Sequence, residues 1–260
     1  MSLQKITPET IRAMKARGER IAALTAYDYP MAKLLDEAGV PFIHVGDSLG
    51  MVVLGYPDTT QVTMAETEHH LRAAARAKPN GLLGADLPYK SYETVADAVA
   101  NAKLLAAAGA EYVKLEGGCE KLPQIKAIMA AGIPVCGHLG MLPQSVREEG
   151  GYHIKGKIES EHQKLIKDAC LLADAGVFAI VLELVAAPVA REISEKIPVP
   201  TIGIGSGDGC DGQILVTPDL IGMFPWFRPR FVKPLADCAA EIKSAVAEWR
   251  KSVETPAKKS

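Results

Sequence analysis

The sequence predicts an α/β fold of the (β/α)8 TIM-type barrel class, in which parallel strands alternate with helices and an N-terminal helix precedes the first strand. Three observations support this prediction. The chain has 260 residues, which matches the roughly 250 that one such barrel needs. Hydrophobic residues make up 48% of the chain but aromatic residues only 5%, which suits aliphatic strands buried between helices. A unit of helix followed by strand also recurs along the chain.

The recurring unit begins with Ala-Gly at the end of a helical stretch and continues as a short apolar run. Glycine at that point fits the left-handed conformation that terminates a helix, and the run has the length of a buried strand. Each run ends in an ionisable residue. The four units that show the full pattern are residues 38–47, 108–116, 131–138 and 175–183.

The other strands are predicted from apolar runs between these units. Helical patterns separate the runs, as at residues 92–107 and 161–175, and strands that alternate with helices indicate a parallel sheet. Eight such units favour a closed barrel, with an open doubly wound sheet as the alternative. The predicted first, third, seventh and eighth strands are residues 20–26, 81–86, 200–204 and, more weakly, 213–216.

No polar linker divides the chain, so we expect residues 1–260 to form a single barrel domain with a frayed polar tail at 251–260. Two small domains are the alternative. The longest irregular stretch is residues 143–160. A loop of that length in a compact domain is usually functional, and we expect it to act as a lid.

Charge and cysteine content exclude several classes of function. Lys and Arg number 29 and Asp and Glu 31, for a net charge of −2, which gives no electrostatic footprint for nucleic acid. The five cysteines form no C-x-x-C pair, which argues against a disulfide framework or a zinc knuckle and favours the cytoplasm. No secretory signal and no run of about 18 apolar residues is found, so no membrane association is expected.

Polar residues follow the predicted strands at their C-terminal ends, where barrel enzymes carry their catalytic groups. One such residue is most often structural, but seven in one ring predict an active site. Lys114 and Glu116 are two residues apart, so they face the same side of their strand. The seven residues are Asp47, Ser48, Asp86, Lys114, Glu116, His138 and Glu183.

Three of these residues predict a metal site. Asp47, Asp86 and Glu116 are hard oxygen donors without an accompanying pair of Cys or His, which suits Mg²⁺ better than zinc. The alternative is that Asp47 and Asp86 cap the helices that follow. Leu-Pro follows Asp86 directly, which makes that residue the less natural cap.

Glu183 is the predicted general base. It follows the apolar run 177–182, where desolvation would raise the pKa of its carboxyl group. The alternative is a salt bridge to a lysine. Lys114 is predicted to neutralise an anionic substrate, unless it pairs with Glu116 or another acidic neighbour.

At these positions the chain resembles the ketopantoate hydroxymethyltransferase family of the phosphoenolpyruvate/pyruvate barrel superfamily. The resemblance runs from about residue 21 to about residue 234. Several independent motifs in the same order make it far more specific than any one of them. They are TAYD (25–28), VGDSLG (45–50), GADLP (84–88), VKLEGG (113–118), GHLG (137–140) and IGIGSG (202–207).

The resemblance implies a role for each predicted residue. Asp47 and Asp86 would be Mg²⁺ ligands, with Glu116 as a third carboxylate that binds directly or through water. Glu183 would take the proton from C3 of 3-methyl-2-oxobutanoate. The residues implied to contact or surround the keto acid are Asp47, Ser48, Asp86, Lys114 and His138.

The resemblance also implies partners. The one-carbon donor would be 5,10-methylenetetrahydrofolate, the product 2-dehydropantoate on the route to pantothenate, and the assembly a homo-oligomer, commonly a decamer. A C–C or P–C lyase or mutase of the same superfamily is the rival enzyme, although the K-K-C-G-H loop of such lyases is absent. A non-catalytic barrel that binds keto acids is the second alternative, and the complete polar set argues against it.

Overall fold

The computed structural model describes residues 5–255 and divides into two compact units, residues 1–214 and 215–260. The first unit contains the barrel. The second contains helices α9 (Thr217–Leu220) and α10 (Cys238–Glu254). The expectation of a single domain stays a prediction.

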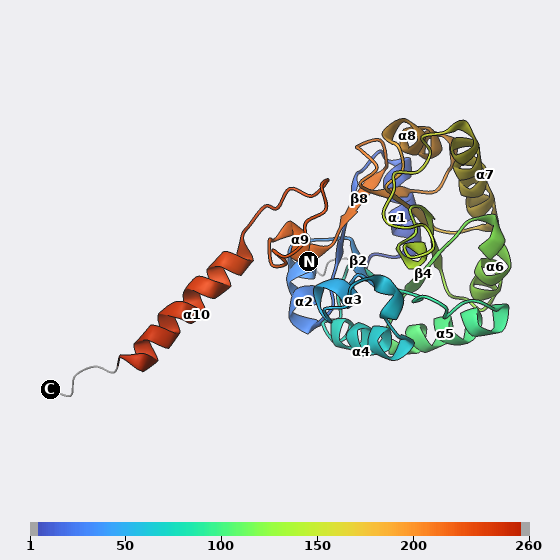
Figure 1. Ribbon diagram of the computed structural model, residues 1–260. Coiled ribbons are helices and arrows are strands. Elements are labelled where there is room, and N and C mark those ends of the chain that lie inside the picture. The colour runs from blue at the N-terminus through green and yellow to red at the C-terminus, as the bar shows by residue number, and fades with distance from the viewer. Residues whose placement is uncertain (1–4, 256–260) are drawn as a thin grey trace. The chain divides into compact units, whose positions relative to one another are not determined.

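The strands close into a barrel in which each strand pairs with the next in the sequence. Figure 1 shows helices α4 to α8 on the outside of the strands. Every pairing between successive strands is parallel. This confirms the predicted barrel and excludes the open sheet. The strands are β1 (Ile21–Thr25), β2 (Phe42–Val45), β3 (Leu82–Asp86), β4 (Tyr112–Glu116), β5 (Val135–Gly140), β6 (Ala179–Glu183), β7 (Thr201–Ile204) and β8 (Gly212–Leu215).

Helices connect successive strands from β1 to β7, a loop without a helix connects β7 to β8, and the predicted N-terminal helix precedes β1. The Ala-Gly signal correctly marks helix ends, since Gly109 (φ 115°) and Gly176 (φ 103°) adopt the left-handed conformation after α5 and α7. Within residues 5–255, no helix is both long enough and apolar enough to cross a membrane. The helices of the first unit are α1 (Pro8–Ala16), α2 (Tyr29–Glu37), α3 (Leu49–Val52), α4 (Met64–Ala75), α5 (Val95–Ala108), α6 (Leu122–Ala130), α7 (Glu159–Ala175) and α8 (Ala187–Lys196).

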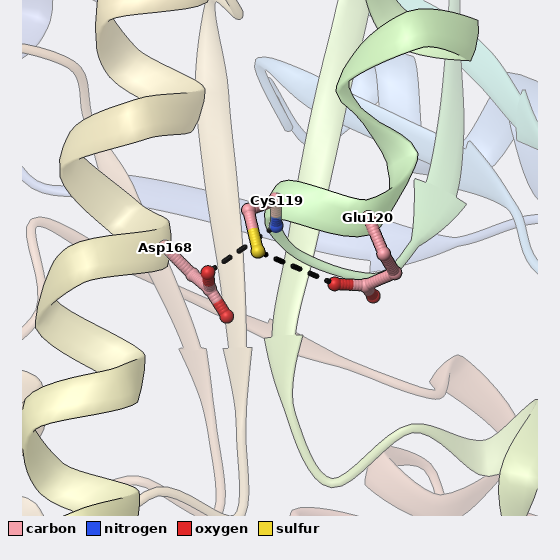
Figure 2. A group of neighbouring side chains, drawn as sticks. All are labelled: Cys119, Glu120 and Asp168. Carbon is pink, nitrogen blue, oxygen red and sulfur yellow. Dashed lines mark hydrogen bonds between the residues drawn. The ribbon is translucent and has the colours of Figure 1, made fainter.

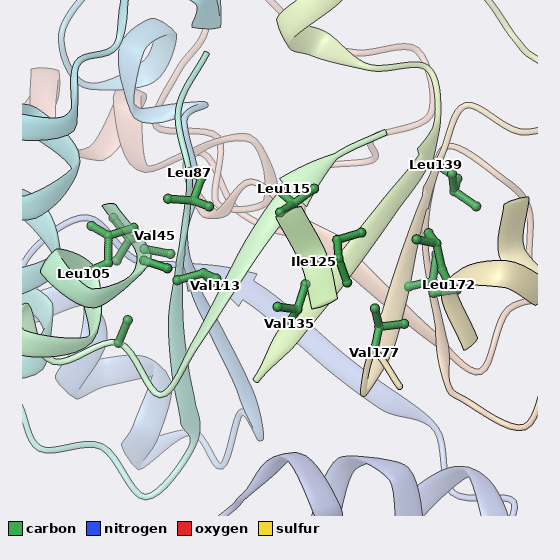
Figure 3. Packing of buried hydrophobic residues seen from close by; sticks show 14 of the residues in the cluster. Val45, Leu87, Leu105, Val113, Leu115, Ile125, Val135, Leu139, Leu172 and Val177 are labelled. Carbon is green, nitrogen blue, oxygen red and sulfur yellow. The ribbon is translucent and has the colours of Figure 1, made fainter. Parts of the chain in front are cut away.

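Apolar side chains form two separate clusters, because successive residues of a strand face opposite sides of the sheet. One cluster lies between the strands and the surrounding helices and includes Val113 of β4 and Leu172 of α7, which Figure 3 shows with their neighbours. The other cluster fills part of the barrel interior and includes Phe42 of β2 and Tyr112 of β4. The barrel is therefore a packed core and not a pore.

The second unit corrects one expectation about the C-terminus. Helix α10 continues to Glu254, so residues 251–254 are helical and do not belong to a frayed tail. Asp237 caps the N-terminus of this helix, because its side chain accepts a hydrogen bond from the backbone N–H of Ala240. Residues 256–260 of the expected tail lie outside the described residues.

Candidate active site

Five neighbouring strands carry the predicted polar residues to the same end of the barrel. β3 ends at Asp86, β4 contains Lys114 and Glu116, β5 contains His138 and β6 ends at Glu183, while Asp47 and Ser48 directly follow β2. The strand register sets Asp86 beside Lys114 and Glu116 beside His138. Sequence-distant residues are thereby brought into one buried group.

Lys114 and Asp86 form a buried ion pair at the centre of this group. Lys114 Nζ lies 2.6 Å from Asp86 Oδ1, and His44 Nε2 lies 3.1 Å from the same oxygen. Burial alone would raise the pKa of Asp86, but the opposing effects of Lys114 and His44 outweigh it and lower that pKa. Asp86 is therefore ionised at neutral pH.

Asp47 lies against Asp86 and is held by a residue from a distant loop. Its backbone N–H donates to Asp86 Oδ2 at 2.9 Å, and its own Oδ2 accepts from Gln144 Nε2 at 2.8 Å. Burial, followed by the charges of Asp86 and Glu116, raises the pKa of Asp47 well above its usual value. A group of carboxylates that raise one another's pKa in this way favours binding of a cation.

Neither aspartate caps a helix, so the structural alternative from the sequence is wrong. The residue at the start of α3 is Ser48, and its side chain makes no capping hydrogen bond. The next long helix after β3 is α5, and it is capped by Thr94. Ser48 Oγ instead lies 2.8 Å from the hydroxyl oxygen of Tyr27.

His138 connects Lys114 to the two glutamates. Its Nδ1 lies 3.2 Å from Lys114 Nζ and 3.5 Å from Glu116 Oε1, and its Nε2 lies 3.3 Å from Glu183 Oε2. Burial and the charge of Lys114 lower the pKa of His138, which favours the neutral imidazole.

The two glutamates have raised pKa values. Burial raises the pKa of Glu183, and the hydrogen bond and charge of His138 offset this only in part. The predicted effect of desolvation on Glu183 is thus confirmed, and the group beside its carboxylate is the imidazole of His138, not a lysine. Burial also raises the pKa of Glu116, to about 8.

Sequence reasoning missed three residues that contact this group. Gln144 binds Asp47, Tyr92 donates to Gln144 Oε1 at 2.5 Å, and His44 lies beside Asp86. His44 is two residues before the end of its strand, and the alternation of the strand could have placed it on the same face. Nothing in the local sequence around Gln144 or Tyr92 indicates that they meet.

The irregular stretch 143–160 begins at the carboxylates and returns near Glu183. It opens with the short 3-10 helix η3 (Pro143–Ser145), and it later pairs with the chain after β6, where the backbone N–H of Lys155 donates to Leu184 O at 2.8 Å. Between these points lies Tyr152, whose pKa is raised by burial and by the charge of Glu183. The loop is therefore bound to the carboxylates at its start and to the chain next to Glu183 near its end. Its motion as a lid stays a prediction.

The carboxylates suit a cation that keeps some of its water. Asp86 Oδ1 and Glu116 Oε1 are buried and make no hydrogen bond of good geometry within residues 5–255, although Lys114 Nζ lies near the first and His138 Nδ1 near the second. Asp47, Asp86 and Glu116 are not gathered as tightly as the ligands of a fully protein-coordinated metal. Mg²⁺ commonly takes one or two carboxylates and completes its shell with water and substrate oxygens, which fits this arrangement.

A tighter group of potential ligands lies elsewhere in the described chain, and its atoms already have partners. Cys119, Glu120 and Asp168 have ligand atoms within 4.8 Å of one another. Figure 2 shows these three side chains together. Asp168 Oδ1 accepts from the backbone N–H of Cys119 at 3.2 Å, and Asp168 Oδ2 pairs with Lys164 Nζ at 2.5 Å. We interpret this group as a structural link between the turn after β4 and helix α7.

Comparison with known proteins identifies the family. The sequence profile described as ketopantoate hydroxymethyltransferase matches residues 5–257. The 3-methyl-2-oxobutanoate hydroxymethyltransferase of Moorella thermoacetica is 53% identical over 251 residues, which cover 96% of this chain and 93% of that protein. The protein of the same name from Ignicoccus hospitalis is 51% identical over 254 residues, which cover 97% and 96% of the two chains.

Solved structures agree on the fold at much lower sequence identity. A phosphonopyruvate hydrolase in complex with oxalate and Mg²⁺ aligns with a TM-score of 0.65 at 16% identity, covering 96% of this chain and 92% of that one. An oxaloacetate acetylhydrolase in complex with oxalate aligns with a TM-score of 0.64 at 14% identity, covering 98% and 90%. Such low identity supports the shared barrel and carries no statement about the reaction. By the profile and the close relatives, the chain belongs to the ketopantoate hydroxymethyltransferase family, a family of transferases.

Proposed function

We propose that this chain transfers a hydroxymethyl group from 5,10-methylenetetrahydrofolate to 3-methyl-2-oxobutanoate, giving 2-dehydropantoate for pantothenate biosynthesis. The relatives of about 50% identity carry the acceptor and the transferred group in their name. The observation that carries the proposal is the buried polar group, in which a lysine pairs with one of three carboxylates and a fourth carboxylate lies beside a neutral histidine. Removal of a proton next to a carbonyl needs both parts.

Mg²⁺ is the proposed metal, with Asp47 and Asp86 as ligands and Glu116 as a third carboxylate, direct or through water. When bound, Mg²⁺ supplies Lewis-acid stabilisation of the negative charge that develops on the keto oxygen. Asp86 is ready for this role because Lys114 and His44 keep it ionised. Asp47 and Glu116 have raised pKa values, so they release protons when a cation binds.

Lys114, Ser48 and His138 are proposed to surround the keto acid. The charges of its acidic neighbours outweigh burial and raise the pKa of Lys114 above its usual value, so the side chain stays cationic near the substrate carboxylate. A preorganised cation in a buried site stabilises developing negative charge more than the same cation in water does. His138 lies between Lys114 and Glu183, where it would border the reacting carbon.

Glu183 is the proposed general base. Burial raises the pKa of its carboxyl group towards neutral pH, and a general base works most effectively when its pKa is near the working pH. The carboxylate accepts the proton from C3, and the electron pair of that C–H bond forms the new bond from C3 to the methylene carbon of the donor as the first of its two C–N bonds to folate breaks. The hydroxyl group of a water molecule replaces the second folate nitrogen on this carbon. The proton taken from C3 and the remaining proton of the water end on the two nitrogens, and tetrahydrofolate leaves.

The rival lyase or mutase function has only the shared barrel in its favour. The chain aligns with phosphonopyruvate hydrolase and a putative phosphonomutase at 16% identity, whereas its close relatives are transferases. Turnover of phosphonopyruvate or isocitrate would revive this alternative. Binding of the keto acid that requires Mg²⁺ but never leads to turnover would favour the non-catalytic alternative.

The direct test is product formation. The protein is incubated with 3-methyl-2-oxobutanoate, methylenetetrahydrofolate and Mg²⁺, and 2-dehydropantoate is measured by mass spectrometry. We expect product in this mixture and none above background when a chelator removes the metal. A complete mixture that yields no more product than the chelated control would contradict the proposed function.

We also propose that the protein is a cytoplasmic homo-oligomer, with the decamer as the expected state. In the second unit, α10 exposes four large apolar residues spaced four, three and four apart, a spacing that aligns them on one face of a helix. Their substitution by glutamate should lower the mass measured by light scattering, and an unchanged mass would remove this helix from the interface. The four apolar residues of α10 are Ile242, Val246, Trp249 and Val253.

The cysteines are consistent with the proposed cytoplasmic location. All five are free, as a reducing compartment permits.

A further inference from the structure

We propose that Gln144, oriented by Tyr92, is a positioning residue that holds the carboxylates of Asp47 and Glu116 in the arrangement that receives the cation. This inference rests on the proposed function and deepens it. It assigns a part in the cation site to a loop side chain that is neither one of the proposed ligands nor a proposed substrate contact.

Gln144 makes hydrogen bonds through its backbone N–H and through both ends of its side-chain amide. Its Nε2 donates to Asp47 Oδ2 at 2.8 Å and to Leu87 O at 3.0 Å, and its backbone N–H donates to Glu116 Oε2 at 3.1 Å. One residue thus binds two carboxylates that come from different strands. The side chain is almost completely buried, with 4% of its surface exposed, so water does not compete for these contacts.

Tyr92 and Leu87 together determine which way the amide of Gln144 points. The carbonyl oxygen of Leu87 can only accept, so it binds the amide nitrogen that also faces Asp47, and the hydroxyl of Tyr92 donates to Gln144 Oε1 at 2.5 Å. Burial, with the charge of Glu116, raises the pKa of Tyr92, so the phenol stays protonated and remains a donor. Tyr92 is itself buried, with 6% exposed.

Electrostatics explains why such a residue is needed. Asp47, Asp86 and Glu116 are buried carboxylates in one group, and Lys114 pairs directly with Asp86 alone among the three. Without donors, the other two carboxylates would be free to turn away from one another. Gln144 supplies one donor to one oxygen of each, so the second oxygen of each is left for the cation. Partners of this kind outside the ligand set commonly change metal affinity by about 10- to 100-fold.

The test compares Gln144→Met and Tyr92→Phe with the wild type by calorimetric titration of Mg²⁺ into the full chain. Methionine keeps the length of the side chain and removes its donors, while the backbone contact to Glu116 remains. We expect Gln144→Met to weaken Mg²⁺ binding by about 10-fold or more and Tyr92→Phe to weaken it by a smaller factor. Because Tyr92 acts through Gln144, the double variant should bind no more weakly than Gln144→Met alone.

Tyr89→Phe is the matched control. Tyr89 lies three residues before Tyr92, and its hydroxyl also donates to the loop 143–160, where it binds Glu148 Oε1 at 3.4 Å. This hydroxyl contacts none of the three carboxylates. We expect the Mg²⁺ affinity of this variant to match that of the wild type. Melting temperatures measured in chelator verify that each variant folds, and Tyr92→Phe carries the test if Gln144→Met does not fold.

The possible failures are distinguishable. The positioning role would be overturned if the wild type binds Mg²⁺ and Gln144→Met binds it with the same affinity. If Gln144→Met does not fold, the same result in Tyr92→Phe would overturn it. Either outcome would leave the proposed function intact. A double variant whose loss equals the product of the two single losses would show that Tyr92 does not act through Gln144. A wild type that binds no Mg²⁺ would remove the cation site itself, and both proposals with it.

Discussion

The barrel interior has two halves that share the same strands but differ in chemistry. Towards the N-terminal ends of the strands the inward side chains are apolar, and two or four residues further along they are polar or charged. β2 passes from Phe42 to His44, β3 from Leu82 to Asp86, β4 from Tyr112 to Lys114 and Glu116, β5 from Cys136 to His138, and β6 from Val181 to Glu183. We call these the apolar half and the charged half.

The apolar half is built around three packed aromatic rings. The centroid of Phe42 lies 5.0 Å from that of Tyr112 and 6.0 Å from that of Phe178, and the rings of Tyr112 and Phe178 are 5.2 Å apart. Ile11 of α1 belongs to the same cluster. Aromatic pairs of this kind stabilise by about 0.5–1.5 kcal/mol beyond the area they bury, so this half stabilises the fold.

The charged half has the opposite energetics. Burying carboxylates and a lysine costs free energy that their mutual attraction does not fully return, and the raised pKa values of Asp47, Glu116 and Glu183 are signs of that cost. Such residues persist where function requires them. The contrast predicts that substitutions in the charged half reduce activity more than stability, and that those in the apolar half do the reverse.

The largest effect is expected for Glu183→Gln. Loss of a general base typically slows a reaction by about 10²- to 10⁴-fold, whereas the neutral amide removes a buried charge and should not lower the melting temperature. Exchange of the C3 proton of 3-methyl-2-oxobutanoate in D₂O, followed by NMR with Mg²⁺ present, measures the step without the folate. An exchange rate equal to that of the wild type would place the base elsewhere.

Phe42→Ala should show the reverse pattern. Removing a buried phenylalanine costs about 3–5 kcal/mol of unfolding free energy, and chemical denaturation measures this loss. Activity per folded molecule should remain near that of the wild type. Phe227→Ala is the control, because 52% of that side chain is exposed in the second unit. Equal losses of stability in the two variants would contradict the assignment of stability to the apolar half.

Gly84→Ala should affect both halves, because the residue lies between them. A Cβ atom on Gly84 would lie 2.2 Å from Tyr112 Cε1, and the Tyr112 hydroxyl lies 2.8 Å from His44 Nδ1, on the ring that contacts Asp86. Overpacking of this kind costs about 1–3 kcal/mol of unfolding free energy, and displacement of His44 should also weaken Mg²⁺ binding. A loss of stability with unchanged Mg²⁺ affinity would show that the two halves are independent.

The smallest effect is a pH dependence of stability. Glu116 has a pKa of about 8 in the fold against an ordinary value of 4.5, so the stability that its protonated form contributes is complete below pH 4.5, declines above it and is lost once pH has risen through 8. Without metal, the unfolding free energy should fall between pH 7 and 9, by about 1 kcal/mol. Denaturation of Glu116→Gln should show a shallower decline. Identical pH profiles for this variant and the wild type would contradict the contribution of Glu116.

The sequence predicted the fold and most of the polar group for identifiable reasons. A parallel strand that ends in an ionisable residue places that residue at one end of the barrel, so Asp86, His138 and Glu183 were predictable from strand ends alone. The roles of these residues came from motif resemblance and remain proposals. Strand boundaries moved by one or two residues, as at β5, which continues to Gly140.

Other features were not predictable because they depend on long-range contacts. Gln144 and Asp47 are separated by 97 positions in the sequence, and nothing local to a loop glutamine indicates which carboxylate it will bind. The polar composition of residues 251–254 suggested a frayed end, but helix α10 includes them. Burial of Glu116 determines its pKa, and burial is a property of the assembled barrel.

The central claim is that carboxylates from separate strands share one cation that the keto acid also binds. Its most direct test is an anomalous difference map from a crystal soaked with Mn²⁺ and 3-methyl-2-oxobutanoate. We predict a peak within coordination distance of Asp47 and Asp86, with the keto acid beside it. A peak at Cys119, Glu120 and Asp168 instead, or none near Asp47 and Asp86, would contradict this account.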